Sequence, residues 1–533
     1  VIRYTMDILQ FQWLMTCSLL VFYVLFSLLV LLLGLYYYGN STFTHFSRQD
    51  VLHYKSLPFL GNMGLLLMKN RSYSDYVLEV YNNIKEKPYG CLYSFQQPII
   101  VIKDPTLIQN ITTKNFHCFS DRRQVFIEGP LWKTGLPHLK GSKWTQVRAE
   151  MDKCFDLDKM KILFSTMLEC CQQFSHSFEK YQQSCEEIPY VCPDDAVINV
   201  ELKSLFTRFA NDFIAKTIFG VKVDSLKNPR NDFFVMGREL VNFENVSSYK
   251  WLGYTTAPKF MKDFGVNLVP NKVTNYFKSL LEETISRRTS SDISNSDLLQ
   301  LFIEAKEKHE NNAATKVSEE DIIANALIFY FAGFDTTSTL LCLVSYEMAR
   351  HPDLQSRLAE EIDNASKKNE GTFTYEIVKN LKYLEMVVCE TLRLHPPVAS
   401  TDRTCVARHY HLYGDPEIEL RTGDSILIPI YGLHHDPKYF PNPQQFDPER
   451  FSEANRHKIH PYTYMPFGAG PRSCLGVHFA LMGVKLMLIN LFSKYSFHMV
   501  SKTPSPLKIT HTGFNITAKG GFWLGLKERK APS

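Results

Sequence analysis

The hydrophobic positions of the chain change their spacing sharply after residue 38. From Phe11 to Tyr38 the sequence is apolar and carries no charge, a run longer than the ~20 residues that span a bilayer. Trp13 lies near one end of this run and Tyr36 to Tyr38 at the other, as in the aromatic belts of membrane interfaces. A cleaved signal peptide is the alternative, but its apolar region is shorter and ends in a small-residue cleavage site. We therefore expect residues 1–40 to form one N-terminal transmembrane helix.

The segment after this run is expected to be a linker and hinge, covering residues 41–62. Ser56–Asn62 (SLPFLGN) combines a proline and a glycine between polar residues, which is typical of a turn or hinge. Three basic residues follow the span: Arg48, Lys55 and Lys69. By the positive-inside rule they place the C-terminal side of the span in the cytosol. Residues 63–533 remain for one large domain.

The large domain shows mainly helical spacing. Residues 93–104 (YSFQQPIIVIKD) alternate and are β-branched, which predicts strands of a small sheet. Residues 195–310 are amphipathic with helical spacing, interrupted by polar breaks near 227–231 and 289–296. Ser318-Glu-Glu-Asp321 is typical of a helix N-cap, and we expect a long helix from there to about Arg350.

Composition changes this picture little. With 45% hydrophobic and 13% aromatic residues the chain has ample material for a core. A net charge of +4, without a concentrated basic face, gives no case for nucleic-acid binding. The twelve cysteines include no C-x-x-C pair, and in a chain of 533 residues we interpret them as reduced thiols rather than a disulfide framework.

One loop contains a candidate chemical centre. Residues Pro466–Gly476 (PFGAGPRSCLG) hold a single cysteine, Cys474, among glycines that let the backbone approach a flat group closely. Arg472 supplies a planar cation suited to a carboxylate. The apolar spacing from Val477 predicts a helix, so Cys474 lies just before an N-terminus that favours a thiolate. Such a thiolate is suited to be an axial ligand of haem iron.

A lone cysteine is more often a small buried hydrophobic residue, and this is the alternative for Cys474. The surrounding pattern, F-x-x-G-x-R-x-C-x-G from Phe467 to Gly476, resembles at every fixed position the haem-binding loop of the cytochrome P-450 family. The resemblance covers the chain from about Ser56 to its end and rests on five motifs in the same order. In detail the chain is similar to the insect microsomal members that metabolise drugs and insecticides.

The resemblance implies a fold and a cofactor. The fold is mainly α with small β-sheets, a triangular helical domain that holds haem b between the long oxygen-activating helix and the helix after the cysteine loop. Residues 63–533 would be this haem-thiolate catalytic domain, and Cys474 would bind the iron. The cofactor-binding residues that the resemblance implies are Cys474, Arg472, Phe467, Gly468, Gly476, Trp144, Arg148, Arg403, Arg122 and Ala332.

For some of these residues the spacing alone favours an ordinary structural role. Trp144 and Arg148 lie at i and i+4 on one expected helix face, which favours a surface cation–π pair. In the family, however, W-x-x-x-R on this helix holds a haem propionate. Arg122 and Arg403 match arginines with the same role.

The centre of the long helix, Phe329–Thr339 (FYFAGFDTTST), is a poor helix former because it contains Gly333 and several threonines. We therefore expect a local distortion of the helix at this point. The ordinary alternative for Thr336 is a hydrogen bond to a carbonyl of its own helix. The segment AGFDTT matches the family pattern A/G-G-x-D/E-T-T, which implies that Thr336 hydrogen-bonds dioxygen and that Asp335 helps to deliver protons through water.

A second set of charges is expected to be structural. Glu390 and Arg393 lie three positions apart on one helix face, where such pairs usually contribute little. In the family this pair is buried and completed by an arginine from a P-E-R-F segment, which is Arg450 here. We assign these three residues to a triad that supports the haem loop.

The resemblance also implies a pocket wall. The expected lining residues are Phe126, Phe331, Ala332, Val398, Ala399, Ser400 and Phe514. Most of them are small or aromatic, which favours an apolar substrate.

These expectations combine into one function. A membrane-anchored, NADPH-dependent monooxygenase would insert one oxygen atom of O2 into lipophilic small molecules such as xenobiotics, insecticides, plant toxins or endogenous lipids and hormones. Electrons would come from NADPH–cytochrome P-450 reductase, with cytochrome b5 as a further partner, at the cytosolic face of the endoplasmic reticulum. Lys143 and Lys485 are candidate reductase contacts, although solvated surface charge explains such lysines equally well.

Two alternatives remain open. The first is a haem-thiolate isomerase or dehydratase of peroxides, and the second is a non-catalytic haem binder. The Asp335–Thr336 pair favours the monooxygenase over both, because proton delivery to oxygen separates monooxygenation from peroxide release.

Overall fold

The computed structural model describes most of the chain. The described residues are 2–43, 51–54, 56–67, 72–123, 130–184, 191–194, 197–241, 261, 263–266, 269–290, 296–308, 317–509 and 518–529. Two of the expected pocket residues, Phe126 and Phe514, lie outside these ranges.

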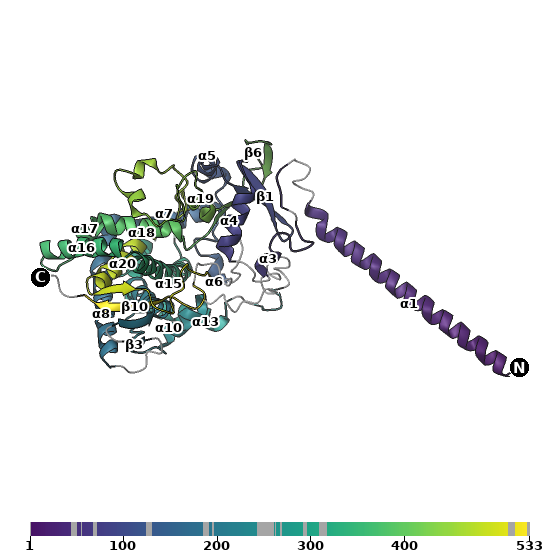
Figure 1. Cartoon of the computed structure of the whole chain (residues 1–533), viewed down its shortest axis with the longest axis horizontal. Coiled ribbons are helices and arrows are strands. Elements are labelled where there is room, and N and C mark those ends of the chain that lie inside the picture. The colour runs from purple at the N-terminus through teal and green to yellow at the C-terminus, as the bar shows by residue number, and fades with distance from the viewer. Residues whose placement is uncertain are drawn as a thin grey trace.

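The N-terminal apolar run forms one long helix, α1 (Ile2–Asn40), which projects from the rest of the chain (Figure 1). Its part from Trp13 to Asn40 is long and apolar enough to cross a membrane, and that window is not buried by the domain. A short 3-10 turn, η1 (Ser41–Phe43), follows the helix. The expected hinge is a tight turn in which Leu57 pairs with Gly61, whose φ is +58°.

Two four-stranded sheets and a hairpin form the smaller β part of the fold. In the first sheet the order is β1 (Tyr89–Ser94), β2 (Gln97–Ile102), β8 (Ser425–Ile428) and β5 (Thr401–Thr404). The predicted strand segment 93–104 contains β2 and the end of β1, which pair antiparallel with Tyr89 opposite Ile102. The second sheet has the order β3 (Val191–Asp194), β4 (Val197–Glu201), β10 (Trp523–Glu528) and β9 (Tyr495–His498). The hairpin is β6 (His409–Leu412) with β7 (Ile418–Arg421).

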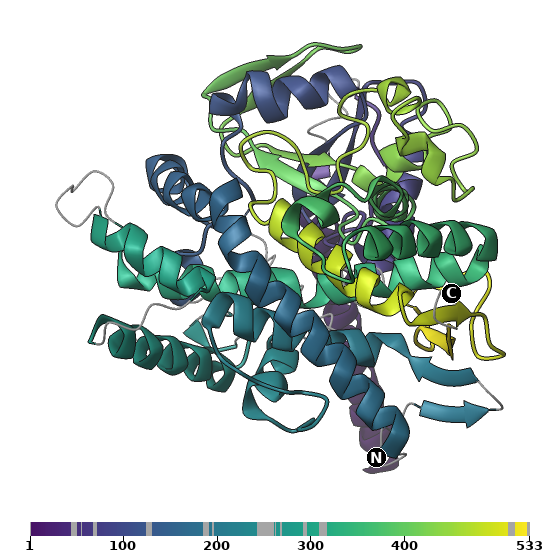
Figure 2. The ribbon, with the colours of Figure 1, turned by 90° about the vertical axis from the view of Figure 1, so that its left-hand side faces the viewer.

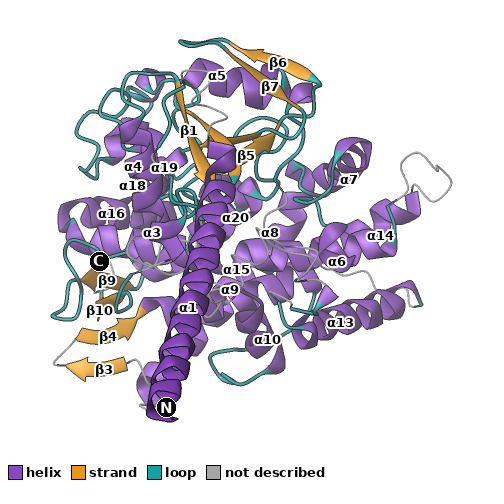
Figure 3. Ribbon diagram, turned by 90° about the vertical axis from the view of Figure 1, so that its right-hand side faces the viewer, coloured by secondary structure: helices purple, strands orange, loops and turns teal. Residues whose placement is uncertain are grey.

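The two sheets lie at opposite ends of the helical body, as the orange arrows in Figure 3 show. The second sheet corrects the expectation that residues 195–310 are helical throughout, because residues 197–201 form β4. β4 pairs with the neighbouring β3 and with β10, and β10 lies more than three hundred positions further along the chain, so no local pattern identifies that second pairing.

Helices make up most of the domain (Figures 1 and 2). Before the second sheet they are α3 (Gly64–Leu67), α4 (Tyr73–Asn83), α5 (Pro105–Gln109), η2 (Asn110–Lys114), η3 (Phe116–Cys118), α6 (Pro130–Lys133), α7 (Gly141–Cys154) and α8 (Leu157–Ser184). Those that follow are α9 (Leu202–Ile214), η4 (Ala215–Phe219), α10 (Asp232–Val241), α13 (Asn271–Thr289), α14 (Leu298–Lys308), α15 (Glu319–Arg350), α16 (Pro352–Lys368), α17 (Tyr375–Lys379), α18 (Lys382–Leu394), α19 (Ile430–His434), η5 (Pro448–Phe451), η6 (Arg456–Lys458) and α20 (Val477–Phe492).

The expected long helix is α15, and it begins with the predicted cap. The Ser318 hydroxyl accepts a hydrogen bond from the Asp321 N–H, and the Asp321 carboxylate accepts one from the Ser318 N–H. This reciprocal pair satisfies two of the free N–H groups at the helix start. Although α15 is apolar and long, most of it is buried, which makes it the core helix of the domain rather than a second span.

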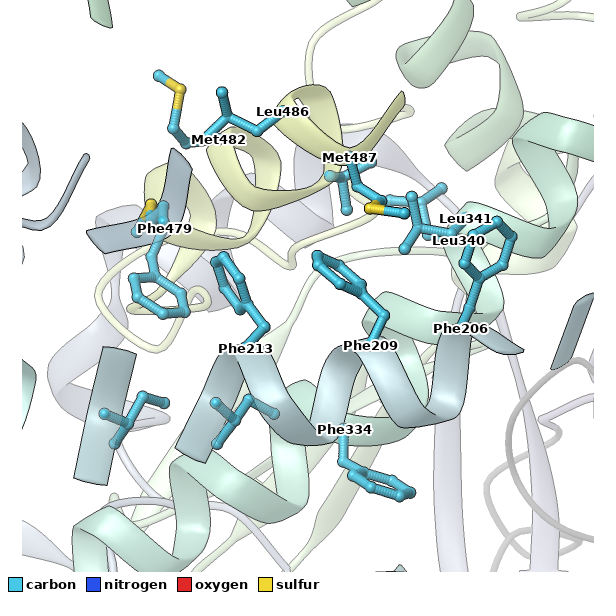
Figure 4. Close-up of a cluster of buried hydrophobic side chains, with 14 of the residues drawn as sticks. Phe206, Phe209, Phe213, Phe334, Leu340, Leu341, Phe479, Met482, Leu486 and Met487 are labelled. Carbon is cyan, nitrogen blue, oxygen red and sulfur yellow. The ribbon is translucent and has the colours of Figure 1, made fainter. Parts of the chain in front are cut away.

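Aromatic and aliphatic side chains bind α9 to α15 and α20. In Figure 4, Phe209 and Phe213 project from α9 toward α20, while Phe334 of α15 lies on the other side of α9. The rings of Phe213 and Phe479 are 5.5 Å apart between centroids. This packing fixes the first turn of α20, and with it the end of the loop at Gly476, relative to α9.

The expected distortion at the centre of α15 is absent, so this prediction was wrong. The helix runs as one α-helix from Glu319 to Arg350. The low helix propensity of Gly333 is overridden by packing, since α15 is buried on most sides and a Cβ at Gly333 would lie 3.1 Å from Ile214 Cδ1.

Candidate active site

The cysteine loop has the geometry that its glycines predict. Gly468 and Gly470 have φ of +76° and +71°, a backbone region that other residues rarely adopt. A Cβ on Gly470 would lie 1.8 Å from the carbonyl oxygen of Thr112, so this glycine is required by close packing as well. The Cys474 N–H donates to the Phe467 carbonyl at 2.9 Å, and α20 begins three residues later.

Cys474 is exposed to solvent, although many protein atoms lie close to its thiol. Burial raises the pKa of its thiol, while the Gly476 backbone and the charges of Arg148 and Arg122 oppose this shift. The thiol is therefore protonated by default and needs a cation at the sulfur to hold it as a thiolate. Among the described residues no group of three or more histidine, cysteine or acidic side chains could hold a metal ion.

Arg472 is tied into the wall of the site by backbone carbonyls. Its guanidinium donates to the carbonyl oxygens of Ser120 at 2.8 Å, Leu136 at 3.2 Å and Leu139 at 2.8 Å. It also lies over the Trp144 ring, 4.1 Å from the centroid. The cation partner of Trp144 is thus Arg472 from the cysteine loop, and not Arg148, which lies four positions further along the same helix.

Two further arginines hold the loop from the outside. The Arg122 Nη2 donates to the Arg472 carbonyl at 2.9 Å, and the Arg148 Nη1 donates to the Ser473 carbonyl at 2.8 Å. Arg148 also forms an ion pair with Asp152 at 2.9 Å. Both arginines therefore contact the residues that immediately precede Cys474.

Arg403 on β5 is the most buried of these cations, with no exposed surface. Its guanidinium donates to the carbonyls of Asp402 and Ala469, but its Nε has no hydrogen-bond partner. Burial and the neighbouring charge of Arg122 lower the pKa of Arg403 to about 9, and the pKa of Arg472 is likewise lowered to about 9. Within the described part of the chain, Arg403 has no carboxylate within 4.0 Å.

This cluster fits the carboxylates of a haem. Four arginines surround the loop, and the nearby aspartates approach Arg122 and Arg472 no closer than 3.9 Å. A buried cation with an orphaned donor is costly unless an anion joins it. The residues present therefore supply both parts of a haem site, a thiol for the iron and an excess of buried positive charge for the propionates.

We expect the replacement Arg403→Met to weaken haem retention by roughly 10- to 100-fold, the loss of one hydrogen bond to a charged group. The rate of haem transfer from the purified protein to an excess of a haem-free acceptor protein measures this directly. Arg421→Met, an exposed arginine on β7, is the matched control and should release haem as the native chain does. Equal rates for the two variants would exclude Arg403 as a propionate ligand.

The middle of α15 presents a partly accessible face in an otherwise buried helix. Phe331, Ala332 and Gly333 keep exposed surface, as do Asp335 and Thr336, whereas the residues after them are buried. The Thr336 hydroxyl donates to the Ala332 carbonyl at 2.7 Å, which is the ordinary back-bonding expected of a helical threonine. Asp335 forms an ion pair with Lys203 of α9 at 2.6 Å, a partner that we did not predict from the sequence.

The three charges assigned to the triad lie together. Arg393 binds Glu390 through two hydrogen bonds, Nε to Oε2 at 2.7 Å and Nη2 to Oε1 at 2.8 Å, and neither side chain is exposed. Arg450 approaches the same carboxylate at 3.4 Å. Arg393 also donates to three carbonyls of the segment before Arg450: those of His434, Pro443 and Gln445.

The expected pocket wall is only partly accessible. Val398 is exposed, and Ser400 shares a 2.6 Å hydrogen bond with the Tyr73 hydroxyl. Ala399 is packed in the hydrophobic core, with 1% of its surface exposed, and its place in the pocket wall stays a prediction. Phe331 meets Trp132 edge to face at 6.0 Å.

The two lysines suggested as partner contacts are both engaged. Lys485 is buried on α20, 3.4 Å from Glu385, so it cannot present its charge to another protein's surface and that prediction is wrong. Lys143 keeps part of its side chain exposed, but its ammonium contacts the buried Asp321 at 2.6 Å.

The fold and the site together fit a haem protein, with a cysteine loop that several arginines contact. A family model described as "Cytochrome P450" matches residues 53–524 of the chain. The chain therefore belongs to the cytochrome P450 family, which implies a haem cofactor, a small-molecule substrate, dioxygen and a redox partner.

Its relatives are insect proteins. The chain is 41% identical over 520 residues to "Cytochrome P450 9e2" of Blattella germanica, covering 95% of this chain and 97% of the relative. It is 34% identical to "Cytochrome P450 9b2" of Drosophila melanogaster, covering 93% and 97%. It is 31% identical to "Cytochrome P450 6k1" of Blattella germanica, covering 93% and 95%.

Proposed function

We propose that the chain is an NADPH-dependent monooxygenase that inserts one atom of O2 into lipophilic small molecules. The single observation that carries the proposal is the exposed Cys474, just before α20, in a loop whose backbone carbonyls accept hydrogen bonds from the guanidinium groups of Arg122, Arg148 and Arg403. When bound there, haem would supply the oxygen-activating chemistry. In the balanced reaction a C–H bond, O2, NADPH and a proton give a C–OH group, water and NADP+.

The side chains have separate tasks in this proposal. Cys474 binds the iron, while Phe467, Gly468 and Gly476 shape the loop that carries it. The groups that hold the propionates are Arg122, Trp144, Arg148, Arg403 and Arg472. Asp335 and Thr336 move protons on the accessible face of α15, beside Ala332. The triad of Glu390, Arg393 and Arg450 supports the cysteine loop structurally.

We further propose a single-pass protein of the endoplasmic reticulum membrane, with the catalytic domain in the cytosol. The exposed apolar surface of α1, which ends at Asn40, supports an anchor over residues 1–40 and a linker over 41–62. Electrons would come from NADPH–cytochrome P450 reductase, with cytochrome b5 as an additional donor. As substrate class we propose xenobiotics, insecticides and plant toxins, or endogenous lipids and hormones, and as a role detoxification.

The test combines the haem-loaded full chain with a P450 reductase, NADPH and a panel of lipophilic compounds. We expect NADPH consumption that depends on the reductase and hydroxylated products labelled from 18O2. Conversion of organic hydroperoxides without NADPH, and no labelled product, would instead identify a peroxide isomerase or dehydratase. Haem binding with neither reaction would identify a non-catalytic haem binder.

A further inference from the structure

The carboxylate of Asp335 is held by a residue from another helix. The Lys203 ammonium lies 2.6 Å from Asp335 Oδ1, 2.9 Å from Ser338 Oγ and 2.7 Å from Thr339 Oγ1. It also lies 3.3 Å from the Asp335 carbonyl oxygen. An ammonium group has three protons, so these three side-chain oxygens can use all of them.

The position of Lys203 in its own helix is unfavourable without this contact. Lys203 is the second residue of α9, where the helix dipole disfavours a cation. The preceding Glu201 offsets part of this charge, but its carboxylate is occupied as the N-cap by the N–H groups of Lys203 and Ser204. The ion pair with Asp335 is therefore what makes a lysine acceptable at this position.

The cluster joins the accessible and the buried sides of α15. Ser338 and Thr339 are fully buried, whereas the side chains of Lys203 and Asp335 keep 22% and 28% of their surface exposed. The charged members thus lie where water can reach them, and the hydroxyls lie behind them. This arrangement fixes the direction of the carboxylate at the accessible face of the helix.

Asp335 and Thr336 are directed by different partners. Consecutive residues of an α-helix are rotated by about 100° from one another, so their side chains cannot share one direction. The Thr336 hydroxyl is bonded along the helix to Ala332, while the Asp335 carboxylate is bonded across to α9. A proton that passes between the two must therefore start from the carboxylate orientation that Lys203 sets.

We propose that Lys203 is a positioning residue for proton delivery. It fixes the Asp335 carboxylate at the partly exposed face of α15, while Ser338 and Thr339 hold the Lys203 ammonium from the buried side. The proposal rests on the proposed monooxygenase function. Loss of the Lys203 charge should increase the share of O2 that is released as hydrogen peroxide. In that side reaction O2, NADPH and a proton give H2O2 and NADP+, whereas the productive reaction gives hydroxylated product and water.

The experiment compares Lys203→Met, Lys203→Arg, Asp335→Asn and the double variant Lys203→Met/Asp335→Asn with the native chain. For each haem-loaded protein we would measure the thermal midpoint and the hydrogen peroxide released per NADPH. We expect Lys203→Met to raise the peroxide ratio roughly threefold or more, with Lys203→Arg restoring most of the native value. The double variant should release as much peroxide as Asp335→Asn alone, because Lys203 acts through that carboxylate.

Lys216→Met is the matched control, because Lys216 has a similarly covered side chain and its own ion pair, with Glu169 at 2.8 Å. Both lysine variants should lower the thermal midpoint, but Lys216→Met should leave the peroxide ratio unchanged. If Lys203→Met lowers the thermal midpoint but leaves the peroxide ratio unchanged, the contact is only a structural ion pair. That result would overturn the proposal. Failure of the native chain to consume NADPH with reductase would overturn the proposed function itself, and the role of Lys203 with it.

Discussion

Replacing Cys474 by serine is expected to abolish the red-shifted Soret band of the reduced, carbon monoxide-bound protein. A serine hydroxyl stays protonated where a thiol bound to a cation ionises, so the variant loses the anionic ligand that pushes electron density to the iron. The loop should keep its shape, because its hydrogen bond from residue 474 uses the backbone N–H and its turns depend on Gly468 and Gly470. NADPH-dependent hydroxylation should disappear with the band.

The control for this prediction is Cys17→Ser, an exposed cysteine of α1 that should leave the spectrum unchanged. Circular dichroism of both variants checks that the helices are retained. A red-shifted band that survives in Cys474→Ser would mean that another residue ligates the iron. A band at the position of histidine-ligated haem proteins in the native chain would remove the thiolate from the proposed site.

The parts of the site that sequence analysis anticipated are those encoded in short segments. The loop around Cys474, the cap at Ser318 and the helical pair Glu390–Arg393 each need only neighbours in sequence to form. Their residue types restrict the backbone strongly, as the positive φ values of Gly468 and Gly470 illustrate. Features of this kind can be predicted from the sequence alone.

The parts that escaped prediction depend on contacts between distant segments. Arg472 bonds to Leu136 across 336 positions and pairs with Trp144, although the spacing favoured Arg148. Lys203 meets Asp335 across 132 positions. A signal existed for Lys203, because a lysine in the first turn of a helix contradicts the usual preference for acidic residues there and indicates a distant anion.

Packing also overruled two local expectations. Low helix propensity at Gly333 predicted a distortion, but propensities of about 1 kcal/mol are small beside the burial of a 32-residue helix. Lys485 was interpreted as a surface charge, yet it lies inside the domain against Glu385. In both cases the sequence pattern described one element correctly but not the neighbour that decides its environment.

Glu390→Gln is expected to prevent the domain from taking up haem. The substitution leaves the fully buried Arg393 without a counter-charge, and breaking a buried pair in this way costs about 3–5 kcal/mol, a large share of a domain's stability. Arg450→Met should be milder, because Arg450 is 3.4 Å from the carboxylate and the two-bond contact of Arg393 with Glu390 survives. The measurement is the absorbance of bound haem per chain after expression with excess haem precursor. It ranks the variants by their haem uptake.

The matched control is Glu453→Gln, which removes the exposed partner of Lys382 at the start of the same helix, and such surface pairs are worth about 0–1 kcal/mol. It should take up haem as the native chain does. Arg393 donates to the carbonyls of His434, Pro443 and Gln445, so its position depends on Glu390 and in turn fixes the segment that leads into the cysteine loop. Full haem uptake by Glu390→Gln would therefore contradict the triad as the support of that loop, since the carboxylate is the group that both arginines share.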